Sequence, residues 1–317
     1  MRGRALPLAI AVATALALSS PVARSQSRPV PAAQLKPLPH VTLTVLSENT
    51  VSGEADVLGE WGLSVLVEAG AHRVLFDTGA GRVLTENARA LNVNLSKLDA
   101  IVISHGHSDH TAGLEKVLDV AGKVDVFIHP DAFKTVFNKG GSPAVAVNMP
   151  LSRNQLAARA RRVVETNGPT LVTEGIMVTG AIPRVTDFED TGLGNQLFDD
   201  KAAATPTKVA EDQALFFRTP EGVVVLLGCA HAGVVNTIRY VADLLGERRI
   251  YAIVGGTHLL NASAQRLAKT EEAFRQYDVR KIMLAHCTGM AAFAELFHAF
   301  PGRCSWPGAG SRIEFGK

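Results

Sequence analysis

The chain has 317 residues, of which 47% are hydrophobic, and its 32 basic residues nearly balance its 30 acidic ones, giving a formal net charge of +2. This composition supplies a core for a globular protein and gives no sign of the basic surface that nucleic-acid binding requires. The chain has only three cysteines, which are too few for a disulfide framework and cannot all pair with one another.

The N-terminus has the layout of a secretory signal peptide over residues 1–25. Two arginines precede an apolar run over residues 5–18, and small residues follow before an expected cleavage near Gln26. The run is shorter than the roughly 20 residues of a membrane-spanning helix, so we expect cleavage rather than an anchor. Residues 26–39 contain four prolines and are predicted to be a linker. The mature protein is therefore expected to be periplasmic or secreted, without membrane attachment.

Residues 40–317 are predicted to form one large α/β domain. In its first part, β-rich runs predict strands at 40–46, 62–68, 73–76, 100–103 and 124–128, and helical spacing predicts helices at 83–91 and 111–120. From 138 to 208 the pattern loosens around a helix at 155–162 and a strand at 176–182. We expect this segment to be an insertion, either a lid over the substrate or a disordered loop.

The C-terminal third of the sequence is more regular. Strands are predicted at 214–218, 223–227, 250–254 and 281–285, and helices at 234–245, 264–277 and 291–300. Strands that alternate with helices indicate sheets covered by helices.

Metal-capable side chains follow several of these strands. The stretch SHGHSDHTAG at residues 104–113 comes after one strand, and His231, His258 and His286 each come after another. Strand ends on one edge of a sheet converge in space, and ligand sites of α/β proteins are commonly built there. Scattered surface histidines would have no reason to follow this rule.

The spacing within the stretch suits two cations. His105 and His107 are two residues apart and can face one cation, while Asp109 and His110 can face a second one beside it. Imidazole and carboxylate are ligands for zinc, iron or manganese, and two such ions share a bridging water or hydroxide. A lone HxH pair is weak support, but HxHxDH between a strand and a helix favours a metal site.

The chain resembles the metallo-β-lactamase fold metallohydrolases, whose signature is HxHxDH at a strand end. Further matches are RVLFDTG at 73–79, GCAHAG at 228–233, GGTHL at 255–259 and HCTG at 286–289. The last three resemble the branch named after dihydropterin-ribofuranosylaminobenzene phosphate synthase. The resemblance implies a mixed α/β, four-layer αββα sandwich.

The resemblance also implies roles for individual residues. Metal ligands would be His105, His107, Asp109, His110, His231 and His286, with Asp109 also catalytic because it orients the bridging water. His231 is assigned to the first metal, with His258 as a competing ligand, a substrate contact or a support for another ligand. Cys229 stands where a bridging aspartate often stands, and is either a core residue or a ligand. Asp77 is expected to fix the tautomer of a metal histidine.

The function expected from these residues is hydrolysis of a small-molecule ester, lactone, lactam or phosphoester by metal-activated hydroxide. One or two Zn²⁺ ions are expected, with iron or manganese as alternatives. Competing hypotheses are iron-dependent redox or oxygen chemistry, a pterin-precursor synthase, and a binding protein without turnover. Expected export argues against the synthase, because that pathway needs cytoplasmic phosphorylated intermediates. The sequence indicates no particular oligomeric state.

Overall fold

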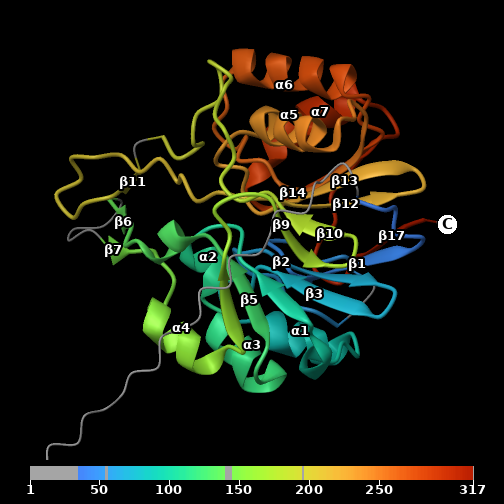
Figure 1. Cartoon of the computed structure of the whole chain (residues 1–317). Helices are drawn as coiled ribbons and strands as arrows, with labels where there is room; N and C mark the ends of the chain where they lie inside the picture. The colour runs from blue at the N-terminus through green and yellow to red at the C-terminus, as the bar shows by residue number, and fades with distance from the viewer. Residues whose placement is uncertain (1–34, 54–55, 140–144, 195, 317) are drawn as a thin grey trace, which may run out of the picture.

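The computed structural model describes residues 35–53, 56–139, 145–194 and 196–316. Two seven-stranded sheets pack face to face, and helices cover the outer face of each (Figure 1). The expected mixed α/β, four-layer αββα sandwich is therefore confirmed.

The N-terminal sheet is antiparallel at one end and parallel at the other. Its strands are, in sheet order, β17 (Arg312–Phe315), β1 (Val41–Ser47), β2 (Ser64–Ala69), β3 (His72–Phe76), β4 (Ala100–Val102), β5 (Asp125–Ile128) and β8 (Arg162–Glu165). Neighbours from β17 to β3 run antiparallel, and those from β3 to β8 run parallel.

The C-terminal sheet repeats this mixture. Its strands are, in sheet order, β16 (Cys304–Ser305), β15 (Lys281–Ala285), β14 (Ile250–Gly256), β13 (Gly222–Leu227), β12 (Leu215–Thr219), β10 (Ile176–Val178) and β9 (Thr170–Thr173). Strands β13 to β16 are parallel, and the remaining pairs are antiparallel. Both sheets therefore have parallel strands whose carboxyl ends can hold a shared site.

Each helix layer covers one sheet. The N-terminal sheet carries α1 (Leu84–Ala90), α3 (Leu114–Ala121) and α4 (Arg153–Arg159), and the C-terminal sheet carries α5 (Val234–Leu245), α6 (Ala264–Gln276) and α7 (Met290–Ala299) (Figure 1). Phe76 and Phe217 belong to the apolar cluster between the sheets. Leu75, the neighbour of Phe76, instead belongs to the outer cluster that contains Val117 of α3, as the alternation of side chains along a strand requires.

Local sequence explains several element bounds. Helix α5 has its predicted bounds, with an apolar face on the core and an end at Gly246, which has a left-handed φ of 63°. Of the helix expected at 111–120, residues 114–120 form α3, whereas Thr111 ends a separate short helix, α2 (Ser108–Thr111). The division falls at Gly113, where a Cβ atom would lie 2.0 Å from the carbonyl oxygen of Thr78. Close packing against that turn therefore overrides the helical pattern.

The segment expected to be one insertion, 138–208, is not one unit. Helix α4 and strands β8, β9 and β10 lie within it and belong to the main sandwich. The rest includes a small sheet of β6 (Phe137–Asn138), β7 (Val145–Ala146) and β11 (Leu197–Phe198), which lies to one side of the sandwich (Figure 1).

The expected signal peptide and residues 26–34 of the expected linker lie outside the described residues. The rest of the linker packs on the domain: Leu35 is buried, and the amide of Leu38 donates to the carbonyl oxygen of Arg218 at 2.8 Å. Lys36, Pro37 and Pro39 are exposed, so this end of the expected linker contacts the domain through Leu35 and Leu38. Within the described part of the chain, no helix combines the length and apolar character needed to cross a membrane.

Candidate metal centre

The carboxyl ends of the parallel strands surround one pocket. The residues after β4 (His107 and Asp109), after β13 (Cys229) and after β15 (His286) line a cavity of about 340 Å³, together with Trp61. The expected convergence of strand ends is thus present, and it joins both sheets.

One side of the centre is made of three histidines, His105, His107 and His231, called the three-histidine group below. Nε2 of His105 lies 3.1 Å from Nδ1 of His107, and the ring of His231 lies 4.7 and 4.9 Å from these two rings. One nitrogen of each residue lies within 4.8 Å of the other two. The structure therefore brings together the three residues that the resemblance assigned to one metal.

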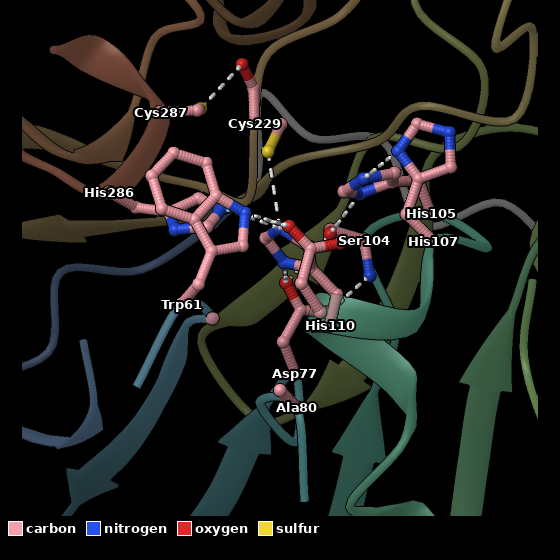
Figure 2. A network of polar contacts seen from close by, with 12 residues as sticks. Trp61, Asp77, Ala80, Ser104, His105, His107, His110, Cys229, His286 and Cys287 are labelled. Atoms are coloured by element: carbon pink, nitrogen blue, oxygen red, sulfur yellow. Dashed lines mark hydrogen bonds and ion pairs between the residues drawn. The ribbon is translucent and has the colours of Figure 1, made fainter. Parts of the chain in front are cut away.

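The other side consists of Asp109, His110 and His286, called the aspartate group below. Oδ2 of Asp109 lies 3.3 Å from Nε2 of His286 and 3.9 Å from Nε2 of His110. The two imidazole Nε2 atoms are 3.2 Å apart. Figure 2 shows His110 and His286 with their rings turned toward one another.

Neighbouring groups fix the ring orientations. Oδ2 of Asp77 accepts from the Ser104 hydroxyl and lies 2.7 Å from Nδ1 of His110, so a neutral His110 presents its lone pair at Nε2. The Ser104 oxygen lies 2.8 Å from Nδ1 of His105 and, because its proton goes to Asp77, accepts there. Nδ1 of His231 donates to the carbonyl oxygen of Thr191 at 2.7 Å. These contacts fix the tautomer and the orientation of each ring, as the hydrogen-bond partners of metal-binding histidines normally do.

The residues fit a divalent cation. Zinc bonds to imidazole nitrogen at about 2.0–2.1 Å, so two nitrogens on a tetrahedral zinc lie about 3.3 Å apart. The observed separations of 3.1 Å in the three-histidine group and 3.2 Å in the aspartate group agree with this value. Nε2 of His231 is buried and has no hydrogen-bond partner. A lone pair in this position needs a cation or a proton.

The two groups differ in charge. Burial lowers the pKa of His105 and His231 well below the ordinary value and lowers that of His107 to about 4. Burial acts in the same direction on His110, but the carboxylates of Asp109 and Asp77 outweigh it and raise its pKa to about 9. Without a metal, at neutral pH, the three histidines are neutral, whereas the aspartate group holds a proton.

Cys229 and His258 take different places beside the groups. Sγ of Cys229 lies 3.1 Å from Nε2 of His110, and in Figure 2 the sulfur points toward that ring. The ring of His258 lies 4.4 Å from that of His231, tilted by 41°, but His258 groups with Cys229 and Cys287, outside the three-histidine group. The geometry therefore favours His231 over His258 as the partner of His105 and His107.

Backbone strain is concentrated in the turns that present these side chains. Four of the eight described non-glycine residues with positive φ lie in them: Asp77 at 58°, Ala230 at 52°, His258 at 46° and His286 at 54°. Such conformations cost of order 1–3 kcal/mol each and cluster at functional sites.

Sequence reasoning gave no individual role to several supporting residues. The indole Nε1 of Trp61 donates to Oδ2 of Asp109 at 3.1 Å, Asn49 Oδ1 lies 3.0 Å from Nδ1 of His286, and Glu48 accepts from the backbone amide of His286. Glu48 and Asn49 directly follow β1, so the rule of polar residues at strand ends could have found them. Thr191 contributes a backbone carbonyl, which leaves no signal in the sequence.

Comparison with known proteins places this geometry in a family. The family model described as the metallo-beta-lactamase superfamily matches residues 62–286. The chain is 28% identical over 262 residues to 7,8-dihydropterin-6-methyl-4-(beta-D-ribofuranosyl)-aminobenzene-5'-phosphate synthase of Methanocaldococcus jannaschii, a match that covers 80% of this chain and 89% of the relative. An uncharacterized protein of the same organism is 29% identical over 258 residues, covering 80% and 93%.

A solved structure is similar over most of its length. The crystal structure of Tm1679, a metal-dependent hydrolase of the beta-lactamase superfamily, has a TM-score of 0.73 and 27% identity and covers 86% of this chain and 98% of that one. The family model, the two-sheet sandwich and the histidine-rich centre agree, and the chain belongs to the metallo-beta-lactamase superfamily.

Proposed function

We propose that the protein is a metal-dependent hydrolase that cleaves an uncharged small-molecule ester, lactone or lactam. One observation carries this proposal: two groups of three ligand-type side chains lie side by side at an open pocket. The similarity to Tm1679, a metal-dependent hydrolase, supports the same reaction class.

The two groups would hold one or two divalent cations, which we propose to be zinc. A bound cation of this kind polarises a carbonyl or phosphoryl oxygen and makes hydroxide available from water near neutral pH. Asp77, Ser104 and Thr191 keep the rings in the orientation that presents their lone pairs. We assign Asp109 a catalytic role because it is in the aspartate group, is partly exposed and lines the pocket, where it can orient a water molecule.

The pocket lining favours an uncharged substrate. Its rim carries apolar side chains from Trp61, Leu193, Leu197 and Leu260, and Gln196 and Asn261 add amides. Among the described residues that line it, none is a lysine or arginine. Apart from the metal ions themselves, binding a phosphate normally uses such cations or a helix N-terminus. A phosphoester is therefore a less suitable substrate than a neutral acyl compound.

A second candidate function is synthesis of a pterin precursor. It is favoured by the 28% identity to the Methanocaldococcus jannaschii synthase. Two points count against it: the expected signal peptide, from which we propose export to a periplasm or the outside, and a described pocket lining without lysine or arginine.

The test begins with the full-length product purified without added metal. Zinc, iron and manganese are quantified, and the same sample is assayed on an aryl ester, an acyl lactone, a β-lactam and a phosphodiester. We expect zinc, and turnover of at least one acyl substrate that chelation removes and zinc restores. Turnover that survives complete metal removal, or no turnover in a sample with zinc at both groups, would contradict the proposal.

A matched assay separates the second candidate. The synthase hypothesis predicts formation of the compound in the relative's name, a dihydropterin-6-methyl ribofuranosyl-aminobenzene phosphate, without hydrolysis of the acyl compounds. The hydrolase proposal predicts the reverse.

A further inference from the structure

Cys229 lies between the two ligand groups. Its Sγ is 3.1 Å from Nε2 of His110, and Sγ, a nitrogen of His105 and a nitrogen of His110 all lie within 4.8 Å of one another. His105 is part of the three-histidine group and His110 is part of the aspartate group. The thiol is thus adjacent to one member of each.

The turn after β13 fixes the thiol in this place. A Cβ atom on Gly228 would lie 2.1 Å from Oγ of Ser104, so only glycine allows the turn to approach the centre this closely. Gly256 donates its amide to the carbonyl oxygen of Gly228, and Ala230 has a φ of 52°. Cys229 is only 2% exposed. Its thiol is therefore held at the centre by the backbone.

The nearby carboxylates are already engaged. Asp77 accepts from the amide and hydroxyl of Ser104 and faces Nδ1 of His110, and Asp109 belongs to the aspartate group. No other described carboxylate is a member of a ligand group at this centre. A side-chain anion shared by the two groups would therefore have to come from sulfur, and thiolate is a strong zinc ligand.

We infer that the Cys229 thiolate is a metal ligand shared by the three-histidine group and the aspartate group. Binding replaces the S–H bond with bonds from sulfur to the cations, and the thiol proton is released to solvent. This role concerns the centre of the proposed hydrolase, but it holds or fails independently of any substrate.

Cys287 supplies the discriminating comparison. Its Sγ contacts the carbonyl oxygen of Cys229 at 3.7 Å, and it groups with Cys229 and His258 only, without His105 or His110. Cys304, the remaining cysteine of the chain, lies in β16, where its thiol contacts the carbonyl oxygen of Leu296. Two other thiols can therefore be removed separately.

The experiment uses the protein stripped with a chelator and loaded with two equivalents of ¹¹³Cd²⁺, which replaces zinc and can be observed by NMR. A thiolate bound to both ions moves both cadmium resonances downfield, whereas a thiolate on one ion moves only one. We expect both to be downfield in the unmodified chain, in Cys287→Ser and in Cys304→Ser. In Cys229→Ser both should move upfield, with binding of the second ion weakened at least about tenfold.

A further variant guards against misfolding. Cys229→Asp supplies a carboxylate and should regain two bound ions per chain without the downfield shifts. The inference is overturned if Cys229→Ser keeps both downfield resonances, if only one resonance responds, or if the shifts follow Cys287→Ser. Cadmium resonances and stoichiometry do not depend on turnover, so failure of the hydrolase proposal would leave this result unaffected.

Discussion

The two ligand groups of the centre have opposite electrostatic characters. The three-histidine group is buried and uncharged, and two of its rings are held by neutral oxygens, of Ser104 and Thr191. The aspartate group contains a carboxylate, and a second carboxylate, Asp77, holds one of its rings. Neighbouring sites on one scaffold can thus differ in how strongly protons compete with metals.

The largest effect is expected from removing a ligand of the uncharged group. His107→Ala should lower metal-dependent turnover at least about 100-fold, because a lost ligand costs more than the 10–100-fold typical of a supporting residue. The aspartate group should still take up one ion. Turnover and bound metal are measured on the same sample, and circular dichroism checks the fold. His129→Ala, which removes a histidine that caps a short helical turn after β5, serves as the control. Unchanged turnover at equal metal content would refute the assignment.

A smaller effect, largest at the other group, is expected from Asp77→Asn. The substitution keeps the shape but weakens the acceptor that faces Nδ1 of His110. Affinity for the ion at the aspartate group should fall about 10–100-fold, and affinity at the three-histidine group should fall less, because Asp77 reaches His105 only through the Ser104 hydroxyl. Titration with a competing chelator resolves the two affinities. Asp99→Asn, which alters a half-exposed carboxylate, should change neither. Equal weakening of both would mean that the groups do not act separately.

The uncharged group should also make the metal-free protein sensitive to acid. The unfolded chain protonates His107 near pH 6.5, but burial holds the folded pKa at about 4, so folding excludes this proton between those values. Stability should fall as the pH drops from about 6.5 to 4, by about 3 kcal/mol for this residue. Urea unfolding at a series of pH values measures it. His107→Gln should flatten the curve, and an unaltered slope in that variant would contradict the assignment.

The aspartate group predicts the opposite trend at alkaline pH. Its His110 has a folded pKa of about 9, raised above the unfolded value, so its contribution is complete below about pH 6.5 and is lost as the pH rises through 9. The same urea series, continued to pH 10 on metal-free protein, should show this loss. His110→Gln should lack it, and an identical alkaline limb in both proteins would show that His110 is not the cause.

The smallest effect is expected from a substitution of Trp61 at the rim of the pocket. Trp61→Phe keeps an aromatic ring beside His286 but removes the indole N–H that donates to Asp109. The indole is half exposed, so the lost hydrogen bond should cost about 1 kcal/mol, seen as a two- to tenfold loss of affinity at the aspartate group. The chelator titration used for Asp77→Asn measures it. A larger loss at the three-histidine group would contradict the pairing of Trp61 with Asp109.

The strands and helices that are long and strongly patterned could be predicted from the sequence. Helix α5 and strand β15 have their predicted bounds because their apolar faces are continuous. Strand β8 was missed because Arg162–Glu165 directly follows a helical pattern and becomes a strand only by pairing with β5 at the sheet edge. Strand β17 was also missed, because it is short and is stabilised by pairing with β1, about 270 residues earlier in the chain.

The candidate centre was predictable where ligand types follow strands. The contacts that support the ligands were less predictable, because they join residues that come together only in the folded chain. Thr191 acts through its carbonyl oxygen, and Ser104 matters only because Asp77 receives its proton. The choice between His231 and His258 likewise needed the structure, since both follow strands of the same sheet.

Each ligand group takes two residues from the segment that follows β4 and includes α2, and one from a turn of the C-terminal sheet, and the two rings of the His110–His286 contact are 176 residues apart in the chain. Neither half of the sandwich contains a complete group. A bound ion would therefore connect the two halves, and metal can bind with high affinity only after both sheets have docked. The rate of metal uptake would then report the rate of the last stage of folding. Free metal at 100 times its dissociation constant would raise the free energy of unfolding of the assembled fold by about 2.7 kcal/mol.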